Sequence, residues 1–187
     1  MLFDHWDLEL TGDRIRLTPF TEADQEPYGI LALGEETYRD FVESAAALGK
    51  PTAVLKKRDG DEVHIIRPLD RDAFLGWVVL QKDEEGKPDI GIHLVPEIRY
   101  QGYGPEAVRL YLNWLYKTEG TGRVYARISA DNVPSQRAFE KLGAVLIRIG
   151  SYGEHLRLLK ELHGEDAEDL HPVMFRYYFI DLPVGGK

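Results

Sequence analysis

The chain has 187 residues, of which 43% are hydrophobic and 29% are charged, a balance that suits one globular domain with a real core. It contains no cysteine, which excludes disulfides, thiolate metal sites and a cysteine nucleophile. Lysine and arginine total 23 against 32 acidic residues, a formal net charge of −9. We find no clustered basic face and expect no nucleic-acid partner.

The acidic balance has two interpretations. It would attract a cationic substrate such as an amine, or it serves solubility alone. The first 14 residues carry acids where a signal peptide needs basic residues, and no apolar stretch reaches membrane-spanning length. We therefore expect a cytoplasmic protein without membrane partners.

Periodicity and turn residues predict the elements in chain order. The first half is expected to form a strand at 14–20, helices at 22–33 and 35–49, and strands at 52–57, 62–67 and 73–81. The second half is expected to form strands at 90–95, 124–128, 145–149 and 173–182, with helices after the first two of them. Between the last two strands, leucines recur at three-residue spacing (Leu156, Leu159 and Leu162), which predicts an inserted helix at about 152–171.

A glycine-spaced turn follows a short apolar strand in residues 89–104, which read DIGIHLVPEIRYQGYG. Pro96 ends the strand, and an amphipathic helix opens at Pro105. Glycines let the backbone approach a ligand, while the helix N-terminus directs unpaired amides and a positive dipole end toward it. Together with the charge of Arg99, this arrangement predicts a phosphate or pyrophosphate site.

The spacing of the glycines narrows the kind of phosphate site. A Walker loop is excluded because no lysine with a serine or threonine follows Gly104. The pattern Gly102-x-Gly104-x-x-Ala107 formally matches a dinucleotide fingerprint, but it lies in mid-chain and no parallel strand with an acidic end follows. A solvated turn with chance glycines is the remaining alternative.

A second strand-to-helix junction lies in residues 123–143. Val124, Ala126 and Ile128 alternate with polar residues, as in a half-buried strand. A helix then begins at Asp131-Asn132, has a proline in its first turn and stops at Gly143.

These segments resemble the GNAT superfamily of N-acyltransferases. Arg99-x-x-Gly102-x-Gly104 is similar to its acyl-CoA pyrophosphate loop, Asn132-x-x-Ser135 to its later strand–helix junction, and RIRLTPF at 14–20 to its first strand. The branch it most resembles is the ribosomal-protein alanine and serine N-acetyltransferases. The resemblance implies one α+β domain over 1–187, with a strongly twisted, mixed, mainly antiparallel sheet of about six to seven strands, a splayed fourth strand and flanking helices.

The resemblance also implies how acetyl-CoA would lie. Its pantetheine arm would pair along the fourth strand, loop amides would hold the pyrophosphate, and an amide near Val95 would stabilise the oxyanion. Pro105 departs from the serine or threonine frequent in the family and removes one amide. The residues assigned to the coenzyme are Leu94, Val95, Arg99, Tyr100, Gln101, Gly102, Tyr103, Gly104, Pro105 and Asn132.

Catalytic roles follow from the same resemblance. Ser135 would protonate the leaving thiolate, or it is a first-turn serine that satisfies an amide. Asn132 would bind pantetheine, or it is a helix N-cap, or both. Glu154 is the preferred general base, with His93 or no dedicated base as alternatives; Glu97 is expected to face solvent. No metal is expected, since the spacing of His155 and His163 suits no shared ion.

The expected function is acetyl-CoA-dependent N-acetyl transfer to a primary amine: a protein N-terminus, an amino acid, an aminoglycoside or a polyamine. The alternative is a catalytically silent acyl-CoA-binding sensor or interaction domain, and a nucleotide-binding module of another fold is a third interpretation. The insert at 152–171 would cover the acceptor site, pack on a second subunit as a homodimer, or cap the sheet.

Overall fold

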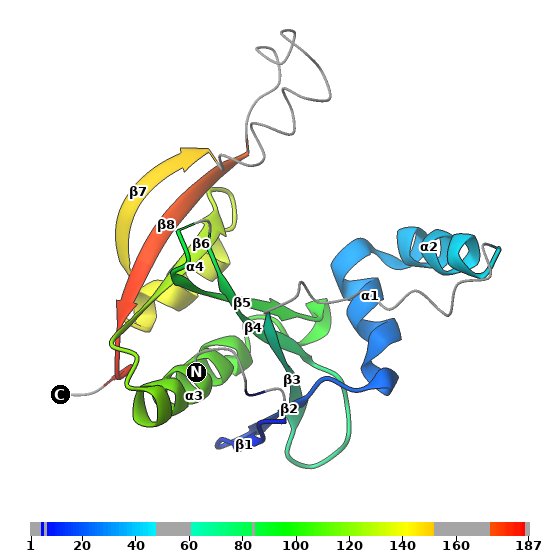
Figure 1. The fold of residues 1–187 in the computed structure, drawn as a ribbon, viewed down its shortest axis with the longest axis horizontal. Helices are drawn as coiled ribbons and strands as arrows, with labels where there is room; N and C mark the ends of the chain where they lie inside the picture. Colours follow the sequence, from blue (N-terminus) through cyan, green and yellow to red (C-terminus); the bar gives the residue numbers. More distant parts are fainter. Residues whose placement is uncertain (1–4, 6, 48–60, 84, 152–172, 186–187) are drawn as a thin grey trace, which may run out of the picture.

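The computed structural model describes residues 5, 7–47, 61–83, 85–151 and 173–185. Within these residues the chain forms one eight-stranded sheet of order β1-β2-β3-β4-β5-β6-β8-β7, with helices on its two faces (Figure 1). Every neighbouring pair of strands is antiparallel except β5 and β6, which are parallel.

The first elements are β1 (Leu10–Thr11), β2 (Ile15–Pro19), the short 3-10 helix η1 (Glu22–Asp24), α1 (Gln25–Leu33), α2 (Glu35–Ala47) and β3 (Glu62–Pro68). Thr21 and Asp24 form a capping box at the start of the helical segment, in which the Asp24 carboxylate accepts the Thr21 amide at 2.9 Å. Arg67 of β3 donates to the same carboxylate at 2.6 Å. This buried pair ties the entry of α1 to the sheet.

The middle of the chain forms β4 (Gly76–Lys82), β5 (Pro88–Leu94), the 3-10 turn η2 (Pro96–Ile98) and α3 (Tyr103–Glu119). The last elements are β6 (Arg123–Ser129), α4 (Val133–Lys141), β7 (Val145–Ser151) and β8 (Met174–Asp181). Gly143 has a φ of +91° just after α4, a left-handed conformation typical of a helix stop.

The alternation of side chains along the central strands divides the core between the two sheet faces. On one face α3 contributes Ala107, Val108, Tyr111, Leu112 and Leu115, all fully buried, to the main core cluster. On the other face, Tyr28 and Leu31 of α1 pack against a smaller cluster of Val63, Ile65 and Trp77. The two faces of the sheet are therefore covered by different helices and different side chains.

The two parallel strands diverge soon after they meet. β5 and β6 register only at Asp89 and Tyr125, near the start of both strands, whereas β4 and β5 pair over seven positions up to Gly76 and Leu94. The end of β5 is thus paired on one side and open on the side that faces β6, which confirms the predicted splayed strand.

The mixed, mainly antiparallel sheet with flanking helices is confirmed, but the predicted count of about six to seven strands is too low. The described residues form eight, one of which is β1, a two-residue strand paired at Leu10 and Leu17. Two residues are too few to show a periodic pattern in a sequence. The predicted strand at 52–57 and the predicted insert helix at 152–171 lie outside the described residues.

Candidate functional site

The turn between β5 and α3 contains two residues with a left-handed backbone conformation. Tyr100 has a φ of +64° and Gly102 a φ of +86°, so two left-handed residues alternate with ordinary ones at the N-terminus of α3. Alternation of this kind is the backbone pattern of a nest, in which successive amides turn toward the same side and can bind an anion. The 17-residue helix behind it adds the positive end of its dipole.

The two positions of the turn that hold glycine favour it for different structural reasons. Gly102 occupies a left-handed N-cap position that favours glycine. Gly104 has no such φ, but a methyl group there would lie 3.2 Å from Leu94 Cδ1 and 3.4 Å from Ile92 Cδ1. The missing side chain therefore lets the first turn of α3 approach the end of β5.

The side chain of Arg14, which immediately precedes β2, bonds to the turn and to the first helical turn of α3. Its Nη1 donates to the Gln101 carbonyl at 3.0 Å, and its Nε donates to the Glu106 carboxylate at 2.8 Å. Its guanidinium also lies 4.6 Å from the centre of the Tyr103 ring. The pairing with Arg14 balances the charge of Glu106, which would otherwise oppose an anion at the helix N-terminus.

The open edge of β5 carries the predicted contacts of the pantetheine arm. The Nε of Arg99 donates to the Leu94 carbonyl at 3.0 Å, which brings Arg99 and Leu94 together beside Gly104. The amide of Arg99 donates to the Pro96 carbonyl at 3.3 Å, so it serves the turn η2. The Arg99 amide is therefore not part of the nest, which consists of the amides that follow it.

The amide of Val95 does not face the opening between β5 and β6. It donates to the Leu75 carbonyl at 3.0 Å, which extends the β4–β5 pairing one residue past β5. The predicted oxyanion donor near Val95 is therefore not the Val95 amide itself, which this bond occupies. Since successive amides of a strand point to opposite edges, the amides of Leu94 and Ile92 point toward β6.

The other wall of the opening ends in α4. Asn132 is the N-cap of α4, and its Oδ1 accepts the Ser135 amide at 3.2 Å. The capping interpretation of Asn132 is therefore confirmed, and the half-buried Ser135 stands in the first turn of that helix. Gln136 donates to the carbonyls of Ser129 and Ala130 at 3.0 Å each, which fixes the junction between β6 and α4.

The three candidate general bases differ in their surroundings. Glu97 is exposed on η2, as expected from the sequence, and Glu154 lies outside the described residues. The His93 ring stacks on Trp77 with centroids 4.5 Å apart and 18° between planes. Desolvation, and then the positive charge of Arg99, lower the pKa of His93.

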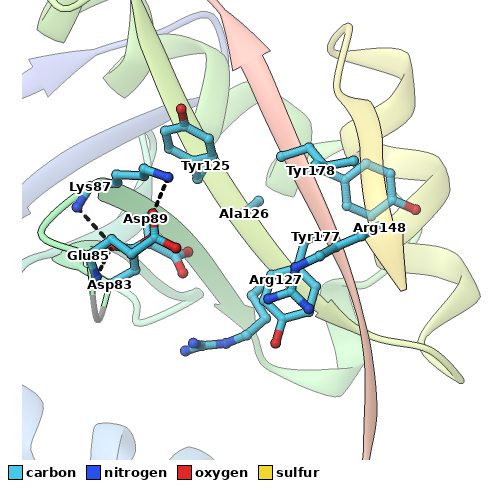
Figure 2. Close-up of a pocket in the computed structure, with 11 residues that line it drawn as sticks. Asp83, Glu85, Lys87, Asp89, Tyr125, Ala126, Arg127, Arg148, Tyr177 and Tyr178 are labelled. Atoms are coloured by element: carbon cyan, nitrogen blue, oxygen red, sulfur yellow. Dashed lines mark hydrogen bonds and ion pairs between the residues drawn. The ribbon is translucent and has the colours of Figure 1, made fainter. Parts of the chain in front are cut away.

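A pocket of about 290 Å³ lies where β5 and β6 begin to diverge, on the same side of the sheet as His93. Figure 2 shows Asp83, Glu85, Lys87 and Asp89 on one side of it, with Tyr125 and Arg127 of β6 between them and the opposite wall. That opposite wall is formed by Arg148 and Tyr177, from β7 and β8.

Asp89 is the buried carboxylate of this pocket, with a residue exposure of 5%. Desolvation raises the pKa of its carboxyl to about 6, while the charge of Arg127 and a hydrogen bond from the Arg127 backbone lower it and Asp83 raises it. A carboxylate in this state binds a proton or a cation more readily than an exposed one.

The described part of the chain has no group of three or more histidine, aspartate or glutamate side chains arranged for a metal ion. Among the same residues, no helix is both long and apolar enough to cross a membrane.

The family model for the acetyltransferase (GNAT) domain matches residues 14–145, from just before β2 to the first residue of β7. The chain belongs to the GNAT family. Its match to the uncharacterised N-acetyltransferase YjdG of Bacillus subtilis is 31% identical over 106 residues, 57% of this chain and 58% of that protein. It is also 31% identical to the N-acetyltransferase 9-like protein of Caenorhabditis briggsae over 118 residues, 62% of this chain and 58% of the relative. This GNAT chain thus spans less than two thirds of the length of these relatives.

Solved structures agree with this GNAT fold. A GNAT-family acetyltransferase from Bacillus anthracis superposes with a TM-score of 0.63 at 19% identity, covering 93% of this chain and 98% of that chain. A structure described as a ribosomal-protein-serine acetyltransferase of Vibrio cholerae gives a TM-score of 0.61 at 13% identity, covering 94% and 98%. At these identities the likeness shows the fold alone.

Sequence reasoning missed several residues of this GNAT site. Arg14 belongs to a segment assigned only to the first strand, yet it holds the turn from 87 or more residues away. Asp89 stands at the start of an apolar run, and the β5–β6 register brings it beside β6, where it is buried. An acidic residue at the start of an apolar run was the one available signal.

Proposed function

We propose that this protein is an N-acetyltransferase that uses acetyl-CoA and acetylates a primary amine. The observation that carries the proposal is the one-sided pairing of β5 next to the α3 nest. The open strand edge suits the amide groups of a pantetheine arm, which would add to it as an extra strand. The amides of residues 100–104 and the α3 dipole suit a pyrophosphate.

The direction of the β5 amides supports a proposal for the oxyanion donor. Because the Val95 amide is bonded to Leu75, we propose an amide on the opposite edge, that of Leu94 or Ile92. Such a donor lies beside the arm that delivers the thioester. It would stabilise the negative oxygen that forms when the amine attacks.

The reaction is a direct transfer. The neutral amine nitrogen forms a bond to the thioester carbonyl carbon, the carbon–sulfur bond then breaks, and the thiolate leaves with a proton donated by Ser135. The proton lost by the amine passes to a base, for which we retain Glu154 and His93. His93 is a candidate because it lies on β5, between the Ile92 and Leu94 amides proposed to face the thioester.

Thiol release from acetyl-CoA in the presence of a panel of amines tests this proposal. The panel should contain amino acids, a polyamine, an aminoglycoside and a short peptide with a free N-terminus. Amine-dependent thiol release with formation of the N-acetyl product supports the proposal. Saturable acetyl-CoA binding without thiol release on any amine would instead identify an acyl-CoA sensor.

A further inference from the structure

The pocket beside Asp89 carries a charge pattern that distinguishes among acceptors. Asp89 and Tyr125, the registered pair of β5 and β6, both line it, so the pocket lies where these two strands begin to part. Its volume of about 290 Å³ is at the small end for ligand pockets. A small molecule fits this space better than a segment of folded protein.

The charged groups of the β4–β5 turn largely satisfy one another. One carboxylate oxygen of Asp83 accepts the amides of Glu85 at 2.9 Å and Lys87 at 2.8 Å. The Lys87 ammonium forms an ion pair with the Glu85 carboxylate and also lies 5.2 Å from the centre of the Tyr125 ring. These groups are therefore committed to the turn and to the Tyr125 wall.

Three other charged residues line the pocket. Asp89 is buried on β5. Arg127 of the neighbouring strand β6 gives the Asp89 carboxylate a backbone hydrogen bond, and Arg148 of β7 lies farther across the pocket, next to Tyr177 (Figure 2). The Arg148 guanidinium lies flat against Tyr177, 3.5 Å from the ring centre. A shift in the β7–β8 register between Leu146 and Arg148 sets this position, and such irregularities re-aim side chains at functional sites.

We propose that this pocket binds the acceptor and that the acceptor carries an anionic group close to its amine, as an α-amino acid does. Its ammonium lies at Asp89 and its anionic group at Arg148 and Arg127. The proposal rests on the transferase function proposed above. It also disfavours polycations, because the pocket lining contains three cations as well as three carboxylates.

Asp89 has a purely structural alternative role. Its carboxylate accepts a hydrogen bond from the Arg127 backbone, which would join β5 to β6 whether or not a ligand binds. Asp89→Asn keeps an oxygen acceptor for this bond and removes only the charge. The variant therefore separates binding of the ammonium from support of the strand junction.

The test compares α-amino acids with their carboxamides as acceptors in the thiol-release assay, together with calorimetric titration of acetyl-CoA. Wild type should prefer the free acids at least tenfold in kcat/KM. Arg148→Gln should reduce the difference in kcat/KM between each free acid and its carboxamide. Asp89→Asn should raise KM for the amine at least tenfold. Neither substitution should change the Kd for acetyl-CoA. Arg71→Gln is the matched control, since Arg71 is exposed and lies outside the pocket lining.

The outcomes distinguish this inference from the proposed function. Equal use of acids and carboxamides by wild type, or acetyl-CoA binding with no turnover on any amino acid, overturns the pocket assignment and leaves coenzyme binding intact. An Arg148→Gln variant that keeps the full preference also overturns it. If wild type does not bind acetyl-CoA at all, the proposed function itself fails.

Discussion

Replacement of Gly102 by alanine is the most discriminating change to the proposed pyrophosphate nest, because the same helix offers a matched control. Gly102 and Gly120 cap the two ends of α3 with φ values of +86° and +67°. A Cβ in the left-handed region costs about 1–2 kcal/mol, so both Gly102→Ala and Gly120→Ala should destabilise by that amount. For a chain of this size the loss corresponds to a fall in Tm of roughly 2–8 °C.

The two variants should differ in coenzyme binding. At Gly102 the added methyl lies 3.2 Å from Arg14 Nη2, and Arg14 holds the Gln101 carbonyl of the turn. At Gly120 no atom lies within 4 Å of the methyl. Displacing one charge-assisted hydrogen bond of the nest costs about 1.5–3 kcal/mol, which is roughly ten- to a hundredfold in Kd.

The assay is calorimetric titration of acetyl-CoA into each folded variant, with urea unfolding to measure stability. Gly102→Ala should bind at least tenfold more weakly than wild type, and Gly120→Ala should bind like wild type. Equal affinities in the two variants, at equal loss of stability, would refute the assignment of the nest to the pyrophosphate.

Three further changes test other parts of the account. Ser135→Ala should lower kcat much more than it weakens acetyl-CoA binding, and an unchanged kcat would remove Ser135 as the proton donor. Asn132→Ala should lower the free energy of unfolding by about 1 kcal/mol through loss of the cap, whereas Asn132→Asp, which keeps an acceptor oxygen, should not; equal losses in urea titrations would contradict the capping role. Burial raises the pKa of Asp89 from 3.8 to about 6, so between these values the folded protein holds a proton that the unfolded chain has lost. Its contribution to stability therefore falls as pH rises through this window, at a cost of up to roughly 3 kcal/mol above it. Asp89→Asn should consequently raise Tm at pH 7.5 and flatten this part of the stability profile; an unchanged or lower Tm there would show that the ionised carboxylate is compensated in the fold.

The turn and its helix were predictable because their signals are local. Pro96 marks the end of β5, Gly102 supplies the left-handed N-cap, and the apolar spacing after Pro105 marks the buried face of α3. Asn132 was predictable for the same reason, since a helix N-cap bonds to an amide only three residues away.

The parts that sequence reasoning missed depend on distant segments. Asp89 is buried because β5 and β6 pair there in parallel, and the partner strand comes more than 30 residues later. Val95 gives its amide to Leu75 across the β4–β5 ladder, which no pattern around Val95 could indicate. Arg14 reaches the turn because β2 and α3 are neighbours only in the folded chain.

The most direct test of the central claim is a calorimetric titration of acetyl-CoA into the wild-type protein. An open β5 edge beside the α3 nest predicts saturable binding to one site per chain, with a Kd of about 1 μM, equivalent to roughly −8 kcal/mol. The absence of any binding heat or saturation up to millimolar acetyl-CoA would contradict the assignment of this opening to an acyl-CoA.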